Sequence, residues 1–269
     1  MTRIRVDAAA LQVLAREHEN DIIAAACTLL PEAASLAVAP VSKFYVGAVA
    51  IDDRGNAFFG ANQEFAGMPL AQTVHAEQSA IAHAWMAGAT RLMHMVVTHA
   101  PCGHCRQFMS ELHDAGDLHV HLPHSRNMPF ADYLPGRFGP ADLGIEAGLL
   151  HPSRQALAIR EDDALAQLAL DAAECSHAPY SRAWAGLALR LRDGRTFAGR
   201  YAENAAYNPS LPALQCALNL VHLHGASARD IAEGVLVCVP GQGHEWQTQT
   251  LWQSLTDAPL RICAAEMAA

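Results

Sequence analysis

Two short segments of the sequence carry residue types that can hold a metal ion and move a proton. The first contains His75 and Glu77, and the second contains Cys102 and Cys105. One imidazole and two thiolates are borderline-soft ligands, the set that suits Zn²⁺. Because three protein ligands leave one tetrahedral position open, they indicate a catalytic zinc site rather than a structural one.

Glu77 stands two residues after His75, so the imidazole can reach the metal while the carboxylate reaches a water molecule on the open position. Such a carboxylate can take a proton from the water and pass it to a ring nitrogen and then to a leaving amine. His-x-Glu followed by Pro-Cys-x-x-Cys is the signature of zinc deaminases. Zinc proteases usually carry His-Glu-x-x-His, which this sequence lacks. The pattern therefore predicts hydrolytic removal of an amino group.

The two cysteines have alternative interpretations. They could be a redox pair, or half of a structural zinc knuckle with His75 as a core histidine. A redox pair leaves the upstream His-x-Glu unexplained, and a knuckle needs more ligands than one Cys-x-x-Cys supplies. The catalytic site is therefore favoured, with His75, Cys102 and Cys105 as ligands and Glu77 as the acid-base residue.

Composition limits the class of protein and of substrate. The chain has 269 residues, 51% hydrophobic and 17% charged, which is typical of a globular protein of one large or two ordinary domains. The net charge is −9, Lys43 is the only lysine, and no basic cluster occurs, so we expect a small neutral substrate and no nucleic acid polymer. The N-terminal stretch resembles no signal peptide, and no apolar run could span a bilayer, which predicts a cytoplasmic protein without a membrane partner.

The seven cysteines show no disulfide-like spacing. Apart from the two metal ligands, we expect them to be buried free thiols of a reducing compartment: Cys27, Cys175, Cys216, Cys238 and Cys263.

The elements that must position the site follow from hydrophobic periodicity and turn signals. The sequence predicts a helix over 7–30 ended by Pro31, strands over 44–51 and 57–61 joined by a hairpin turn, a helix over 74–88, a strand over 92–98, a helix from Pro101 to about His113, and a strand over 118–122. Both metal-binding segments then lie at helix N-termini, where backbone N–H groups and the helix dipole stabilise thiolates.

The second half of the chain repeats the first at an offset of 139 residues without a gap. The matched pairs include Gly47/Gly186, Gly55/Gly194, Phe58/Phe197, Gly60/Gly199 and Glu64/Glu203. At this offset His75 faces Leu214 and Glu77 faces Cys216, and no Pro-Cys-x-x-Cys follows. We therefore expect a duplicated fold whose second copy binds no zinc.

These motifs, with the runs Gly60–Phe65 and Pro101–Glu111, resemble the cytidine deaminase family, in particular the long two-copy type of bacteria such as enterics. The resemblance implies an α/β fold of two cytidine-deaminase-like α/β/α domains, each a mixed sheet with helices on both faces. A helical arm over 1–20, a catalytic domain over 21–150 and a degenerate domain over 151–269 are expected. It also implies zinc-dependent deamination of cytidine and deoxycytidine in pyrimidine salvage, with one Zn²⁺ in the N-terminal half.

The resemblance also implies substrate contacts, which we take to include Gln63. Asn62 and Glu64 match positions that hydrogen-bond the ribose hydroxyls, although a strand-end cap is an alternative role. Phe44 matches the aromatic residue that packs on the pyrimidine, and the backbone N–H of Ala76 would bind the base carbonyl.

Two further aromatic residues link the resemblance to a homodimer. Phe138 and Tyr207 match side chains that reach the site from the inter-domain connection and from the partner's second copy, so the C-terminal half would complete the partner's site. Core packing is the rival role for both. The chain departs from the family at Tyr207, where phenylalanine is expected, and at Thr98-His99-Ala100, where an aromatic residue and a threonine are expected.

Histidines crowd the sequence near the metal motif, and we interpret them as surface or core residues: His99, His104, His113, His119, His121 and His124. The rival functions are a deaminase of another base, of a nucleotide or of RNA, and a catalytically silent zinc-binding scaffold or RNA-binding module. A nucleotide enzyme would need cations for the phosphate, and Arg106 is the only basic residue beside the motif.

Overall fold

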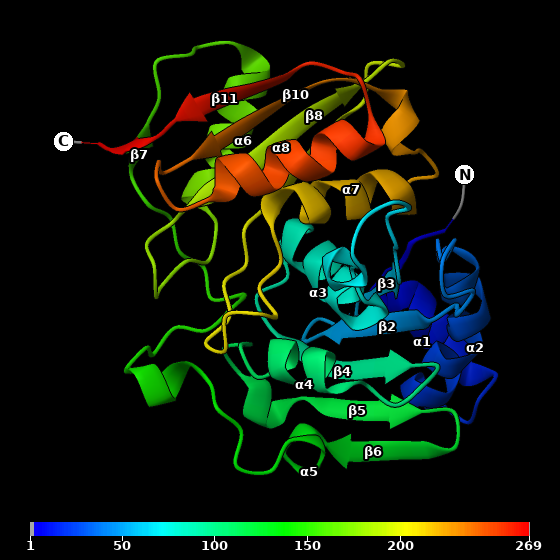
Figure 1. The fold of residues 1–269 in the computed structure, drawn as a ribbon. Helices are drawn as coiled ribbons and strands as arrows, with labels where there is room; N and C mark the ends of the chain where they lie inside the picture. The colour runs from blue at the N-terminus through cyan, green and yellow to red at the C-terminus, as the bar shows by residue number, and fades with distance from the viewer. Residues whose placement is uncertain (1–2, 269) are drawn as a thin grey trace. The chain divides into compact units, whose positions relative to one another are not determined.

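The computed structural model describes residues 3–268 (Figure 1). The chain forms two compact units. The first contains residues up to His151 together with Asn204–Pro209, and the second contains Pro152–Glu203 and the residues from Ser210 onward. No helix within residues 3–268 has the length and apolar character needed to cross a membrane.

The first unit is built on a six-stranded mixed sheet. Its elements are β1 (Arg5–Val6), α1 (Ala8–Arg16), α2 (Ile22–Ser35), β2 (Gly47–Asp52), β3 (Ala57–Ala61), η1 (Leu70–Gln72), α3 (Ala76–Met86), β4 (Leu92–Val97), α4 (Gly103–Met109), η2 (Ala115–Asp117), β5 (His119–Leu122), β6 (Ser125–Pro129), α5 (Phe130–Tyr133) and η3 (Pro140–Leu143). The strands lie in the order β1-β3-β2-β4-β5-β6. The β4–β5 pair is parallel, and every other neighbouring pair is antiparallel.

Helices α2 and α3 cover opposite faces of this sheet, and two glycines allow their close approach. A Cβ atom on Gly47 would lie 2.4 Å from a backbone nitrogen of α2, and one on Gly60 would lie 2.2 Å from a backbone nitrogen of α3. Gly47 pairs with Ala61 and Gly60 pairs with Ala48, so the two glycines point to opposite sides of the sheet. The first turn of α3, which follows His75, is thereby fixed against β3.

The second unit repeats this arrangement. Its elements are β7 (Leu157–Ala158), α6 (Ala164–Glu174), β8 (Ala185–Leu191), β9 (Thr196–Arg200), α7 (Ala213–Leu223), η4 (Ala228–Asp230), β10 (Ile231–Cys238), α8 (His244–Leu255), β11 (Leu260–Ala264) and β12 (Glu266–Met267). The order β11-β10-β8-β9, with β10 and β11 parallel, matches β5-β4-β2-β3 of the first unit. Cβ atoms on Gly186 and Gly199 would again lie 2.2 Å from the backbones of α6 and α7. The predicted duplication of an α/β/α fold is confirmed.

The single helix predicted over 7–30 is wrong. The structure has two helices, α1 and α2, because Glu19 and Asn20 both adopt positive φ (57° and 64°) and Asp21 caps the second helix. Helix α2 then continues through Pro31 to Ser35, since its buried face packs on the sheet beyond that residue. The buried residues of both helices belong to one hydrophobic cluster, so the hydrophobic pattern of the sequence does not mark the boundary between the helices.

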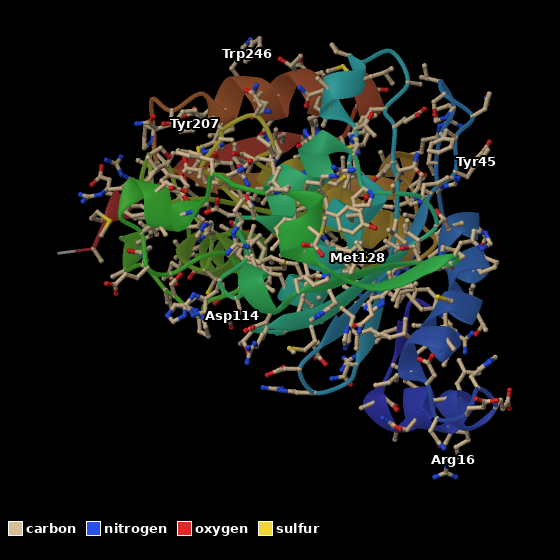
Figure 2. The ribbon with its side chains drawn as sticks, turned by 90° about the horizontal axis from the view of Figure 1, so that it is seen from below. Arg16, Tyr45, Asp114, Met128, Tyr207 and Trp246 are labelled. Carbon is tan, nitrogen blue, oxygen red and sulfur yellow. The ribbon has the colours of Figure 1, made fainter. Side chains whose placement is uncertain are left out.

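The arm expected over 1–20 packs on the first unit. Leu11 and Ala15 of α1 lie in the same buried cluster as residues of α2, β2 and β3. Arg16, at the end of α1, points outward (Figure 2). The other predicted helices and strands of this half are present. β3 has the predicted bounds, β2 runs from Gly47 to Asp52 instead of 44–51, and α4 ends at Met109 rather than near His113.

Candidate metal centre and substrate pocket

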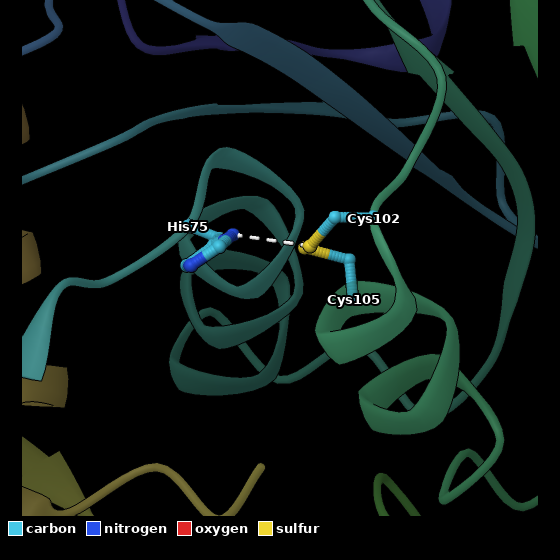
Figure 3. A group of neighbouring side chains, drawn as sticks. All are labelled: His75, Cys102 and Cys105. Carbon is cyan, nitrogen blue, oxygen red and sulfur yellow. Dashed lines mark hydrogen bonds between the residues drawn. The ribbon is translucent and has the colours of Figure 1, made fainter. Parts of the chain in front are cut away.

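The three predicted metal ligands converge from two helices (Figure 3). His75 is the N-cap residue of α3, Cys102 is the N-cap residue of α4, and Cys105 lies in the first turns of α4. Their ligand atoms all lie within 4.8 Å of one another, and residues 3–268 contain no second such group of three. Glu77 is not a member of this group.

The two ligand-atom distances at Cys102 fit a tetrahedral zinc ion. Cys102 Sγ lies 3.5 Å from His75 Nδ1 and 3.6 Å from Cys105 Sγ. Ligands at zinc–sulfur and zinc–nitrogen distances of about 2.3 and 2.0 Å would be separated by roughly 3.5–3.8 Å at tetrahedral angles. The donor set and its spacing therefore suit Zn²⁺ with a fourth position left for a non-protein ligand.

The electrostatics of the cluster favour a cation. The hydrogen bond between the two sulfurs, with backbone N–H groups of α4 and the nearby His75, lowers the pKa of the Cys102 thiol to about 4. The same bond and burial raise the pKa of Cys105. A divalent cation bound between the two sulfurs would stabilise both as thiolates. Glu77, the second residue of α3, is buried with Oε2 3.2 Å from Cys105 Sγ, and burial raises the pKa of its carboxyl.

A pocket of about 290 Å³ opens beside the ligands. Ligand sites typically occupy about 300–1,000 Å³, so this pocket suits a small molecule. Its wall contains four of the predicted substrate-binding residues, namely Phe44, Asn62, Glu64 and Ala76, together with Glu77 and two metal ligands, His75 and Cys102.

Two of the buried polar residues of the wall, Asn62 and Glu64, hold the loop that carries Phe44. Asn62 accepts a hydrogen bond from the Val46 N–H (2.8 Å) and donates one to the Phe44 carbonyl (2.9 Å). Glu64 Oε2 accepts from the N–H groups of Val41 (2.8 Å) and Ser42 (3.1 Å). Burial opposes ionisation of Glu64, but the bonds from Ser42 and Val41 keep the pKa of its carboxyl below the ordinary value. A fixed carboxylate therefore lines the pocket.

Three predicted substrate-binding residues do not line the pocket of their own chain. Gln63 lies between two pocket residues, and its side-chain oxygen is buried without a hydrogen-bond partner. Because side chains alternate along an extended segment, Gln63 points away when Asn62 and Glu64 point in. Phe138 and Tyr207 are 44% and 66% exposed and also lie outside the pocket. Tyr207 lies at the surface of the molecule (Figure 2).

Two histidines contact the site, although the sequence analysis interprets the histidines near the motif as surface or core residues. His99 lines the pocket, with its ring centroid 4.8 Å from that of Phe44 and its Nδ1 3.1 Å from Thr98 Oγ1. His104 stacks on His75 at 4.8 Å between ring centroids. His99 stands two residues before the Pro-Cys-x-x-Cys motif and His104 stands within it, and this nearness in sequence was the available signal. Sequence reasoning also missed Ser42, Leu70 and Thr73 of the wall.

The second unit keeps one part of this site and has replaced the rest. Glu203 accepts hydrogen bonds from the N–H groups of Tyr180 (2.8 Å) and Ser181 (3.1 Å), the same two distances as at Glu64. Tyr201 stands where the first unit has Asn62, and its ring packs 4.6 Å from that of His244. The second copy therefore retains the carboxylate that holds a loop, without the metal ligands.

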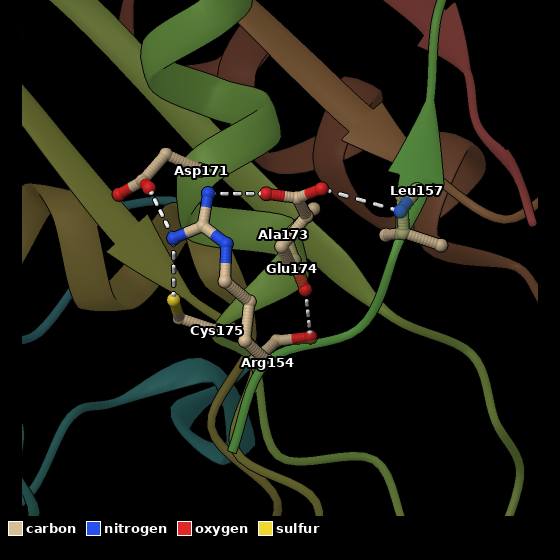
Figure 4. A network of polar contacts seen from close by, with 7 residues as sticks. Arg154, Leu157, Asp171, Ala173, Glu174 and Cys175 are labelled. Carbon is tan, nitrogen blue, oxygen red and sulfur yellow. Dashed lines mark hydrogen bonds and ion pairs between the residues drawn. The ribbon is translucent and has the colours of Figure 1, made fainter. Parts of the chain in front are cut away.

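The polar contacts around Arg154 in the second unit have a structural role and form no candidate binding site (Figure 4). Arg154 donates to Asp171 Oδ1 (2.7 Å), pairs with Glu174 and contacts Cys175 Sγ (3.5 Å), while Glu174 accepts from the Leu157 N–H (3.2 Å). These bonds connect Arg154 and Leu157, near the start of the unit, to α6.

All seven cysteines are free, but Cys27 and Cys175 are half-buried rather than buried as expected.

The chain matches the family model for the cytidine and deoxycytidylate deaminase zinc-binding region twice, over residues 21–120 and 130–246. It is 49% identical to the cytidine deaminases of Yersinia pestis (strain Pestoides F) and Yersinia pseudotuberculosis (strain YPIII) over 230 residues, which cover 84% of this chain and 77% of each relative. Similar solved structures include the cytidine deaminase of Mycobacterium tuberculosis (30% identity, 43% of this chain, 94% of that chain, TM-score 0.38) and that of Burkholderia pseudomallei (32%, 42%, 97%, 0.38). Together with the His-Cys-Cys centre and its neighbouring glutamate, the family matches and the Yersinia relatives establish that this chain belongs to the cytidine and deoxycytidylate deaminase family.

Proposed function

We propose that this protein catalyses the zinc-dependent hydrolytic deamination of cytidine and 2′-deoxycytidine to uridine and 2′-deoxyuridine, with release of ammonia. The observation that carries the proposal is the convergence of His75, Cys102 and Cys105 beside buried Glu77 at one pocket. Bound through these three ligands, Zn²⁺ supplies a Lewis acid that lowers the pKa of a water molecule.

Glu77 is suited to carry protons through the reaction. Its burial favours the protonated form, so the carboxylate readily takes a proton from the attacking water. Glu77 then gives that proton to N3 of the pyrimidine as the new C4–O bond forms. It next transfers a proton from the added oxygen to the departing amine, so the C4–N bond breaks and ammonia leaves.

The pocket wall supplies contacts for a nucleoside. Asn62 and Glu64 are buried polar groups that bind the ribose hydroxyls, and the exposed ring of Phe44 packs on the pyrimidine. Ala76 is the first residue of α3, where backbone N–H groups lack an intrahelical partner, so its N–H binds the base carbonyl. Gln63 is left out of this set because it does not line the pocket.

Purified protein should release ammonia from cytidine and deoxycytidine far faster than from cytidine 5′-monophosphate or free cytosine. Among the lysine and arginine side chains that the structure describes, none lines the pocket, so a phosphate would find no cation from them, and cytosine lacks the sugar that Asn62 and Glu64 bind. Coupled detection of ammonia would measure the four rates. Preference for the monophosphate would contradict the assignment to nucleosides.

Glu77→Gln should keep bound zinc and lose about 10²-fold or more in turnover, since it removes the proton carrier and no metal ligand. Cys102→Ala is the matched variant, and it should lose zinc and turnover together. Metal content by atomic emission and steady-state rates separate the two. Wild-type turnover in Glu77→Gln, or full zinc occupancy in Cys102→Ala, would refute the assigned roles.

Glu64→Ala and Glu203→Ala form a matched pair within one chain. Each removes a buried carboxylate that accepts two backbone N–H bonds, and hydrogen bonds to charged groups contribute about 1.5–3 kcal/mol each. Both variants should lower the denaturant midpoint to a similar extent, but only Glu64→Ala should also raise KM for cytidine. An equal rise in KM for Glu203→Ala would argue against ribose binding by Glu64.

We also propose that two copies of the chain assemble as a homodimer in the cytoplasm. The catalytic domain over 21–150 would place exposed apolar side chains at its pocket: Phe44 and Leu70 line the pocket, and the exposed Val41 and Tyr45 are sequence neighbours of the lining residues Ser42 and Phe44. Such exposed apolar side chains are typical of a surface that a partner covers. The degenerate domain over 151–269 would then present Tyr207 to the partner's pocket, with Phe138 approaching from the connection. The cysteine-ligated zinc and free thiols suit a reducing compartment.

Mixed dimers of a Glu77→Gln chain and a Tyr207→Ala chain test this arrangement. If Tyr207 acts on the partner's pocket, one site of each mixed dimer combines an intact Glu77 with an intact Tyr207. Dimers isolated with two affinity tags should then show the wild-type KM at about half the wild-type kcat, consistent with one intact site in two. A KM equal to that of the Tyr207→Ala homodimer would place Tyr207 at its own chain's site, and a mass equal to the 28.8 kDa chain would exclude the dimer.

A further inference from the structure

The segment Asn204–Pro209 lies in the second copy of the sequence but belongs to the first compact unit. Asn204, Ala205 and Pro209 are buried. This segment forms hydrogen bonds with a residue of α3, with a residue of α4 and with a residue just after the end of α4. These two helices carry the metal ligands.

On the α4 side, the contacts are reciprocal. Asn204 Nδ2 donates to the Gln107 carbonyl (3.0 Å), and Gln107 Nε2 donates to Asn204 Oδ1 (3.4 Å). The Ala205 N–H donates to Glu111 Oε2 (2.8 Å), and Glu111 is completely buried. Gln107 stands two residues after Cys105, so the segment is bonded directly to the ligand-bearing helix.

On the α3 side, one buried side chain makes the connection. Gln78 Nε2 donates to the Pro209 carbonyl (3.0 Å), and Gln78 Oε1 accepts from the backbone N–H of His75 (3.3 Å). Gln78 is 2% exposed. The amide therefore links the end of the segment to the backbone of a metal ligand.

We propose that Asn204–Pro209 is a brace that fixes the first turn of α3 relative to α4, with Gln78 and Glu111 as positioning residues for the zinc site. The ligands come from two separate helices, and α4 has seven residues, too few to hold its place without tertiary contacts. The brace thus keeps His75 at the observed spacing from Cys102 and Cys105. The proposal rests on the proposed function only in taking zinc as the bound ion.

The brace gives the non-catalytic copy a part in the reaction within its own chain. Groups that orient metal ligands typically change metal affinity or activity by about 10- to 100-fold when they are removed. A segment that merely packs on the surface would change neither once the protein is folded. Zinc affinity therefore distinguishes the two roles.

Gln78→Leu keeps the side-chain volume and removes both amide bonds, and Glu111→Leu removes the anchor of Ala205. Each should weaken zinc binding by about 10- to 100-fold in competition with a chromophoric chelator, while circular dichroism shows a folded chain. Glu111→Gln keeps an acceptor oxygen and should bind zinc as the wild type does. Asn208→Ala, an exposed position of the same segment, is the matched control and should also be unchanged. Asn204→Ala replaces Glu111→Leu if that variant does not fold.

A double-mutant cycle separates a brace from two independent contacts. Once the contact between the brace and α3 is removed, removing the contact at α4 should reduce the zinc affinity little further. Gln78→Leu/Glu111→Leu should therefore bind zinc about as weakly as the weaker single variant. Fold-changes that multiply in the double variant, or single variants with wild-type affinity, would overturn the proposal. Because the readout is zinc affinity, failure to deaminate cytidine would refute the proposed function and leave this test intact.

Discussion

Two helix N-termini meet at one point in the first unit, and the chemistry of the site depends on that meeting. His75 and Cys102 occupy the N-cap positions of α3 and α4, so neither ligand has a long flexible segment between itself and its helix. The unpaired N–H groups and positive dipole ends of the two helices favour thiolate at the same place. A cation held there would neutralise the thiolates, and the carboxylate of Glu77, 3.2 Å from Cys105 Sγ, would remain available to carry protons. The sheet fixes the position of the first turn of α3, because Gly60 of β3 has no side chain and the helix backbone can pack directly against it.

Much of this could be predicted because it is local in sequence. His-x-Glu and Cys-x-x-Cys each lie within one turn of a helix, so their spacing alone indicates which side chains share a direction. The hairpin of β2 and β3 has its turn signal in the chain as well, and the 139-residue repeat carries it into the second unit. Features that depend on residues close together in the chain, such as these motifs and the hairpin turn, could therefore be predicted from the sequence alone.

The failures have a different physical origin. The break between α1 and α2 occurs at Glu19 and Asn20, whose left-handed conformations interrupt no hydrophobic pattern. Gln63 points away from the pocket because side chains alternate along an extended segment, but it was predicted to bind substrate together with its neighbours Asn62 and Glu64. His99 lies in the pocket through its contact with the ring of Phe44, which is distant in the sequence, so hydrophobic periodicity does not reveal it.

The close contact at Gly60 also decides which parts of the pocket can change. The backbone of α3 rests directly on β3, so the side of the pocket formed by Ala76 and Glu77 has no room to retreat. The opposite side is the loop of Ser42 and Phe44, held by side-chain hydrogen bonds rather than by helix packing. Enlargement of the pocket for bulkier bases must therefore come through this loop and the neighbouring His99, and a redesign that targets the helix would lose the fold before it gained a substrate.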